Sequence, residues 1–172
     1  MGKVIGKPTP LIDAGQKVTG KAMYTDDFKF PNMVYVGLHR SPHAHAKIMS
    51  IDTSVAAAHP GIKAVITGKD IPIAFGVLPI SPDETAMAVD KVRYVGEIVA
   101  AVAGETPEAA RAGADLIRVS YKPIKNFITP DESLVECSED EKIHQHTKNS
   151  KNIHKIADLS FNDPKDGIAS SS

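Results

Sequence analysis

The sequence has no tryptophan and only five phenylalanines and four tyrosines among 172 residues. So few aromatic rings argue against a stacking platform for nucleic-acid bases. The formal charge is -1, so no global field attracts nucleic acid or an anionic membrane. No apolar run reaches the roughly eighteen residues of a membrane-spanning helix, and the N-terminus lacks the apolar region of a secretion signal. We therefore expect a cytoplasmic protein that binds neither nucleic acid nor membrane.

Only one cysteine is present, Cys137, so an internal disulfide and a Cys-x-x-Cys motif are both impossible. It lies among acidic residues, in the segment Glu-Cys-Ser-Glu-Asp-Glu. Neighbouring carboxylates raise the pKa of a thiol, which argues against a nucleophilic cysteine. A reducing compartment is the simplest interpretation.

Acidic residues offer few candidates for acid–base chemistry. The pairs Asp26-Asp27, Asp83-Glu84 and Asp131-Glu132 lie in expected turns, where solvated charge is the usual outcome. Glu97 is the best single candidate, because it directly precedes an apolar run. A structural ion pair between Arg93 and Glu97 is the favoured interpretation.

Hydrophobic periodicity predicts alternating strands and helices. We expect strands at 33–39, 44–51, 62–67, 98–103 and 117–121, with a short edge strand at 21–25. Helices are expected at 53–59 and 107–116, the second starting with Thr106 as N-cap and Pro107 in the first turn. Residues 98–121 thus form a strand–helix–strand crossover. The expected class is α/β (α+β), a mixed sheet with helices packed on one face.

Composition divides the chain into four parts. Residues 1–20 are expected to form an extended N-terminal arm, and 21–130 the α/β domain. Residues 131–152 hold many charges and few apolar side chains, which predicts a polar linker. Residues 153–172 are expected to start a following domain that is truncated.

The segment from Ile71 to Ile80 is apolar although Pro72, Pro79 and Pro82 interrupt it and its neighbourhood. Loops are usually polar, so an apolar loop must pack on its own sheet, meet a partner or line a ligand passage. These alternatives stay open on the sequence alone.

Two His-x-His pairs, His43/His45 and His144/His146, raise the question of a metal site. A bound metal needs three or four ligands, and neither pair has further plausible ligands nearby in sequence to complete a set. Hydrogen bonding of imidazoles on the polar side of a strand is the favoured interpretation for the first pair. Zinc or nickel binding is the alternative.

Five segments, in this order and with similar gaps, resemble the xanthine dehydrogenase/aldehyde oxidase family of molybdenum hydroxylases. They are 18–27 (VTGKAMYTDD), 40–48 (RSPHAHAKI), 51–54 (IDTS), 92–103 (VRYVGEIVAAVA) and 119–121 (VSY). The resemblance covers nearly the whole chain from about Pro8 onward. It implies the α/β hammerhead domain that begins the molybdopterin-binding subunit.

The loop sequence Phe75-Gly76-Val77-Leu78-Pro79-Ile80 further resembles the 4-hydroxybenzoyl-CoA reductase branch, closest to its alpha subunit. Family members generally use water to hydroxylate a carbon next to a ring nitrogen or an aldehyde, and electrons leave through iron–sulfur clusters and often FAD. The branch runs reductively and removes a phenolic hydroxyl from an aromatic thioester.

The resemblance places the molybdenum–pterin cofactor and the catalytic glutamate in segments downstream of this region. We therefore predict no catalytic, cofactor-binding or metal-binding residue in this chain. The expected role is structural: a domain of an oxidoreductase, inactive alone, that helps form the subunit scaffold and the substrate passage. The residues expected to line that passage are Phe75, Gly76, Val77, Leu78 and Pro79.

Expected partners are the remaining part of the molybdenum-binding subunit and the iron–sulfur and flavin subunits. The chain would then be a fragment, a truncated gene product or one piece of a split subunit. The alternative is a free-standing binding or assembly module that reuses the fold without redox chemistry.

Overall fold

A computed structural model describes residues 5–6, 8–78, 81–145, 149–153 and 156 of the chain. The chain divides into two compact units, 1–33 and 34–172. Among described residues, no helix is long and apolar enough to cross a membrane.

The described part of the first unit contains two short helical turns, α1 (Ala14–Val18) and the 3₁₀ turn η1 (Thr25–Asp27). The short strand predicted at 21–25 is wrong, because those residues are not part of any strand. The Asp27 carboxylate accepts a hydrogen bond from the backbone N–H of Tyr24 at 2.8 Å and so starts a turn there.

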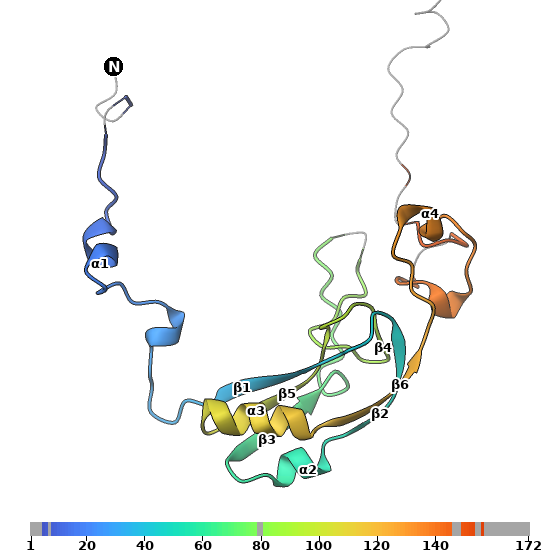
Figure 1. Ribbon diagram of the computed structural model, residues 1–172, viewed down its shortest axis with the longest axis horizontal. Helices are drawn as coiled ribbons and strands as arrows, with labels where there is room; N and C mark the ends of the chain where they lie inside the picture. Colours follow the sequence, from blue (N-terminus) through green and yellow to red (C-terminus); the bar gives the residue numbers. More distant parts are fainter. Residues whose placement is uncertain (1–4, 7, 79–80, 146–148, 154–155, 157–172) are drawn as a thin grey trace, which may run out of the picture. The chain divides into compact units, whose positions relative to one another are not determined.

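The second unit is an α+β domain with two three-stranded sheets (Figure 1). The first sheet has the order β1–β5–β3, and the second β4–β2–β6. The strands are β1 (Tyr35–Arg40), β2 (Ala46–Asp52), β3 (Ile62–Thr67), β4 (Lys91–Val92), β5 (Ile98–Gly104) and β6 (Arg118–Pro123). The helices are α2 (Ser54–Ala58), α3 (Pro107–Leu116) and α4 (Pro130–Ser133), with a second 3₁₀ turn, η2 (Glu139–Glu141).

All strand pairings in the described part of the chain are antiparallel, and the strands form two sheets where one mixed sheet was expected. The apolar run of β5 occupies the centre of its sheet, with β1 on one side and β3 on the other. Both edges of β5 are therefore filled, and β6, which follows α3, pairs with β2 in the other sheet. The predicted crossover at 98–121 exists as strand, helix and strand, but it links two sheets and is not a parallel unit.

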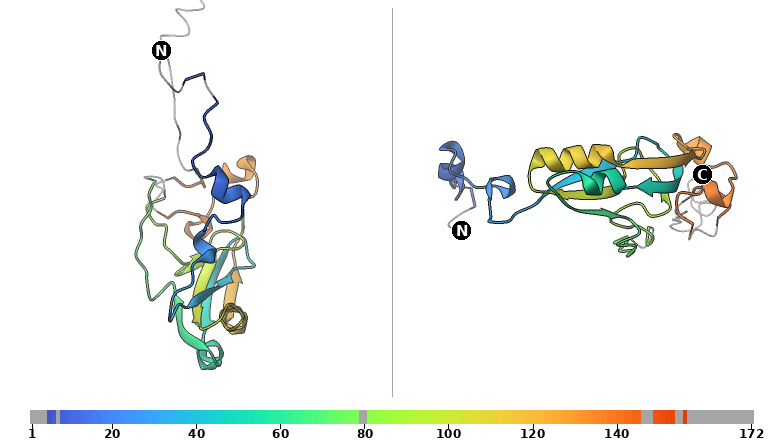
Figure 2. Two further views of the ribbon diagram at one scale, coloured as in Figure 1. Left: turned by 90° about the vertical axis from the view of Figure 1, so that its left-hand side faces the viewer. Right: turned by 90° about the horizontal axis from the view of Figure 1, so that it is seen from below.

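Helix α3 lies along one face of the sheet β1–β5–β3 (Figures 1 and 2). Its start is as predicted: the Thr106 side chain accepts a hydrogen bond from the N–H of Ala109 at 3.1 Å, and Pro107 opens the helix. Small residues bring the helix close to the strands. A Cβ at Gly37 would lie 2.1 Å from the carbonyl oxygen of Ala110, so only glycine fits there.

Two small apolar cores hold the second unit together. One lies between α2, α3 and β5 and includes Ala56, Val102 and Ile117. The other includes Val92 and Val99 and joins the start of β5 to the sheet β4–β2–β6. The buried apolar residues are mostly alanine and valine. Their small side chains let the helices approach the sheets closely, so the core has a small volume.

Residues 130–152, expected to be mostly a polar linker, contain local structure. The Thr129 hydroxyl and the Glu132 carboxylate form a reciprocal capping box around α4. Further along, Glu136 forms an antiparallel bridge with Lys151. The carbonyl oxygens of Asp140, Lys142 and Ile143, in and directly after η2, accept hydrogen bonds from Lys91 and Arg93, which makes these residues part of the site described next.

Candidate functional site

A cavity of about 440 Å³ lies where the loop after β3, the turn between β4 and β5, and the segment after η2 come together. Its lining combines a polar and charged group of side chains with an apolar and aromatic group. The lining residues are Phe75, Asp83, Glu84, Thr85, Ala86, Arg93, Tyr94, Glu97, Ile143 and His144.

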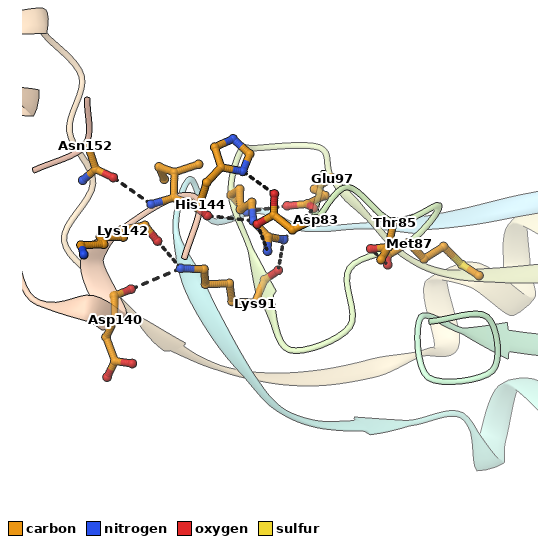
Figure 3. A network of polar contacts seen from close by, with 11 residues as sticks. Asp83, Thr85, Met87, Lys91, Glu97, Asp140, Lys142, His144 and Asn152 are labelled. Carbon is orange, nitrogen blue, oxygen red and sulfur yellow. Dashed lines mark hydrogen bonds and ion pairs between the residues drawn. The ribbon is translucent and has the colours of Figure 1, made fainter. Parts of the chain in front are cut away.

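Arg93 organises the polar wall. Its Nε donates a hydrogen bond to the carbonyl oxygen of Ile143 at 3.1 Å. Its two terminal nitrogens each lie 3.8 Å from a carboxylate oxygen, one of Asp83 and one of Glu97. The predicted ion pair between Arg93 and Glu97 is therefore confirmed, and it belongs to a larger cluster (Figure 3).

The turn between β4 and β5 places Glu97 beside Arg93. The N–H of Glu97 donates to the carbonyl oxygen of Tyr94 at 3.2 Å, and Gly96 has φ +89°, a conformation that glycine adopts without strain. Ser41 fixes the turn through backbone hydrogen bonds at 2.8 and 2.9 Å. As a result the Glu97 carboxylate also accepts the backbone N–H of Arg93.

Glu97 is the most buried carboxylate of the cluster, with a side chain 12% exposed. Burial raises the pKa of Glu97 above its usual value, and the N–H and charge of Arg93 offset only part of this. Because Glu97 is committed to Arg93, the geometry supports the structural interpretation over a catalytic one.

Asp83 corrects the expectation of a solvated turn carboxylate. Its side chain is 29% exposed, and Oδ1 lies 2.8 Å from Nδ1 of His144. Burial on its own raises the pKa of Asp83, but the hydrogen bond and charge of His144, with the charge of Arg93, hold it below the usual value. The partners are 61 positions apart, so no local sequence pattern could have revealed the pair.

Lys91 attaches the segment after η2 to β4. Its ammonium group donates to the carbonyl oxygens of Asp140, at 3.4 Å, and Lys142, although only 6% of the residue is exposed (Figure 3). Burial, followed by the charge of Arg93, lowers the pKa of Lys91. Asn152 continues the attachment, because its Oδ1 accepts the N–H of Ile143 at 2.8 Å.

Stability of the cluster should depend on pH in two opposite ways. Asp83 has a lowered folded-state pKa, so its contribution is present above its unfolded value of about 3.9 and is lost as pH falls through the folded value. Glu97 has a raised pKa, so its contribution is present below about 4.3 and is lost as pH rises through the folded value.

Urea titrations from pH 3 to 7 should test both assignments. As pH rises, the free energy of unfolding of Glu97→Gln should increase relative to that of the parent protein. As pH falls, Asp83→Asn should lose less of its free energy of unfolding than the parent protein does. Parallel curves for all three proteins would contradict these assignments.

The apolar wall belongs to the loop predicted to line a passage. Phe75 lines the cavity and its N–H donates to the carbonyl oxygen of Glu84 at 2.9 Å. Val77 and Leu78 are 82% and 55% exposed and are absent from the cavity lining. A Cβ at Gly76 would lie 2.0 Å from the carbonyl oxygen of Ser81, so the two arms of the loop are in close contact there. Pro79 lies outside the described residues.

The histidine pairs differ from one another. His45 is buried, not on a polar strand face, and its Nδ1 lies 2.9 Å from the carbonyl oxygen of Lys125, while Nε2 has no partner among the described residues. The ring of His43 meets Tyr121 edge-on with 4.9 Å between centroids. Both precede β2 and do not lie on a strand. His146 of the second pair lies outside the described residues.

The part of the chain that the structure describes contains no group of three or more His, Cys, Asp or Glu side chains able to hold a metal. The single thiol is also unsuited to a cluster, because burial, and then the charge of Glu141, raise the pKa of Cys137. The described residues thus offer no ligand set for an iron–sulfur cluster.

Comparison with known proteins identifies the domain. The family described as "Aldehyde oxidase and xanthine dehydrogenase, a/b hammerhead domain" matches residues 19–125. The chain belongs to this family. The predicted α+β hammerhead fold is thereby confirmed.

The hammerhead chain is 41% identical over 134 residues to a probable xanthine dehydrogenase subunit of Bacillus subtilis, covering 76% of this chain and 18% of that protein. It is 37% identical over 168 residues to the "Nicotinate dehydrogenase large molybdopterin subunit" of Eubacterium barkeri, covering 95% of this chain and 38% of that protein. The chain thus spans well under half of either relative.

Among solved structures, the hammerhead chain resembles the aldehyde oxidoreductase of Desulfovibrio gigas with a TM-score of 0.71 and 28% identity, over 81% of this chain and 16% of that one. It resembles the CO dehydrogenase of Oligotropha carboxidovorans with a TM-score of 0.67 and 32% identity, over 74% of this chain and 16% of that one. These relatives are oxidoreductases of the molybdenum hydroxylase family.

Proposed function

We propose that this chain is a structural domain of a molybdenum hydroxylase-type oxidoreductase, inactive alone, that supplies scaffold and one wall of the substrate passage. The observation that carries the proposal is the exposed apolar loop beside the polar cavity. Ile73, Phe75, Val77 and Leu78 of this loop are between 55% and 82% exposed. Apolar side chains gathered in this way on a short loop are typical of a surface that another molecule covers.

Phe75 is part of both the apolar loop and the cavity lining. It belongs to the exposed apolar loop and also lines the cavity with Arg93 and Glu97. The loop is anchored on both sides of Phe75, through its own N–H and through the close approach at Gly76. A planar, largely apolar substrate would therefore meet an aromatic ring on an anchored stretch of backbone, which favours binding of such substrates.

Phe75→Asp and Leu78→Asp test this role in the complete enzyme. Both positions are exposed, so the domain should keep its free energy of unfolding within about 0.5 kcal/mol. Because a carboxylate in the passage disfavours an apolar substrate, KM should rise about tenfold while the molybdenum content stays unchanged.

Val55→Asp is the matched control. Val55 is 55% exposed, as Phe75 and Leu78 are, but it lies on α2 and does not line this cavity. Steady-state kinetics should distinguish it from the two loop variants. If Phe75→Asp and Leu78→Asp both give the kinetic constants of the control, the loop does not line the passage.

Cofactors and partners follow from the same proposal. The molybdenum–pterin cofactor would supply the redox chemistry, and it would be held, with the iron–sulfur clusters and FAD, by other segments or subunits. Support comes from the printed name of the Eubacterium barkeri relative, a large molybdopterin subunit.

We also propose the 4-hydroxybenzoyl-CoA reductase branch for the complete enzyme, supported by the loop sequence from Phe75 to Ile80. An assay of the purified enzyme with an aromatic CoA thioester and a low-potential electron donor should then show loss of the phenolic hydroxyl. Activity only with N-heterocycles or aldehydes would instead assign the hydroxylating branches.

A further inference from the structure

Two rows of apolar side chains cross the sheet β1–β5–β3 on the face opposite α3. Strand register defines the rows, because directly paired residues point to the same side. The rows are Val36–Ala103–Ala64 and Leu38–Ala101–Ile66. We call these six residues the open face.

Four of the six residues of the open face are exposed, although none of the six is polar. Val36 is 63% exposed, Ile66 40% and Leu38 38%, and Ala64 is also exposed. The opposite face of the same strands is covered by α3, which contacts Gly37 and Val102. A sheet face that stays in water normally carries polar side chains, so an apolar one indicates a surface that another element covers.

We propose that the open face is the docking surface for the remaining molybdenum-binding part of the same enzyme. This inference rests on the proposed function and adds the surface through which the domain is held. Relatives that match 76% to 95% of this chain extend far beyond it, since the match fills only 18% and 38% of their length. These relatives therefore contain additional polypeptide, outside the matched region, that can cover the open face.

The size of the open face argues for this occupant over a second copy of the chain. Three strands about 4.8 Å apart and three residues of about 3.4 Å along each strand give a face of roughly 150 Å². A stable interface between separate proteins needs about 800 Å² on each partner. The open face alone is far too small for that, so it fits one part of a wider contact between parts of one enzyme, which can be as small as roughly 300 Å² per side because other contacts keep the parts together.

Carbene footprinting of the enzyme purified from its native host tests the proposal. Labelling is compared between the isolated 172-residue chain and the same chain within the assembled enzyme. We expect Val36, Leu38 and Ile66 to be labelled in the isolated chain and at least fivefold less in the enzyme. Val55, on α2, should be labelled equally in both and serves as the control.

The outcomes separate this inference from the proposed function. If the chain assembles with a molybdenum-containing partner and the open face remains labelled, the docking surface is wrong and the proposed function stands. If no such partner is found, the proposed function fails, and the inference fails with it. Protection of the face only in oligomers of the isolated chain would identify a second copy as the occupant and overturn the inference.

Val36→Thr and Ile66→Thr give an independent readout. Threonine keeps the β-branched shape of the side chain, so the strands should still form. A hydroxyl buried without a partner should increase the fraction of chain that dissociates on dilution of the enzyme about tenfold per substitution. Val55→Thr should leave dissociation unchanged, and equal dissociation of all three variants would contradict the proposal.

Discussion

Gly37→Ala should lower the free energy of unfolding of this chain by about 3 kcal/mol, a large effect for a single methyl group. A Cβ at this position would lie 2.1 Å from the carbonyl oxygen and 2.6 Å from the carbonyl carbon of Ala110. Both are backbone atoms of α3, so no side-chain rotation can relieve the overlap. The helix must move off the sheet, which opens the core around Val102 and Ile117. Urea denaturation followed by circular dichroism measures the loss.

Gly15→Ala is the matched control for this substitution. Gly15 lies in α1, and a Cβ there would have no atom within 4 Å. Alanine in an open helical position normally stabilises by about 0.5 to 1 kcal/mol relative to glycine, because it restricts the unfolded chain. If Gly37→Ala lowered the free energy of unfolding no more than Gly15→Ala does, the account of close packing between α3 and β1 would be contradicted.

The second large effect is expected at Arg93. Arg93→Met removes the guanidinium from the half-buried carboxylates of Asp83 and Glu97 and from the carbonyl oxygen of Ile143. Leaving such groups without their cation should cost about 2 to 3 kcal/mol in the free energy of unfolding. Methionine keeps most of the length of the side chain, so the loss reports on charge and hydrogen bonding more than on packing.

A double-mutant cycle with Glu97→Gln makes this prediction specific. Once Arg93 is replaced, the carboxylate of Glu97 is a buried charge without its cation, so Glu97→Gln should recover about 1 kcal/mol in that background. Hydrogen-exchange protection of the segment after η2 should fall in Arg93→Met, because the bond to Ile143 is lost. Strict additivity of the two substitutions, with unchanged protection, would show that the cluster is a set of independent surface charges.

Local chemistry explains which elements could be predicted. Thr106 and Pro107 mark the start of α3 because capping needs only neighbouring residues, and the apolar run of β5 indicated a central strand. The pairing of Arg93 with Glu97 was also visible, since the two are four positions apart in the chain.

Contacts between distant segments could not be predicted. The pairs of Asp83 with His144 and of Lys91 with carbonyl oxygens in and directly after η2 join segments about fifty to sixty positions apart. The charge-rich composition of 131–152 predicted a solvated linker, whereas carbonyl oxygens of that segment are hydrogen-bonded by cations from β4 and the turn after it. The division of the strands between two sheets could not be predicted either, because hydrophobic periodicity indicates where strands lie but not which strands pair.

The most direct test of the account is metal analysis of the protein purified from its native host, with the co-purifying chains identified by mass. The account predicts that the chain elutes with a larger polypeptide that contains molybdenum and with a cysteine-rich iron–sulfur subunit. A metal-free chain that elutes alone, in cells that contain active molybdenum enzymes, would contradict it and would favour a free-standing module with the hammerhead fold.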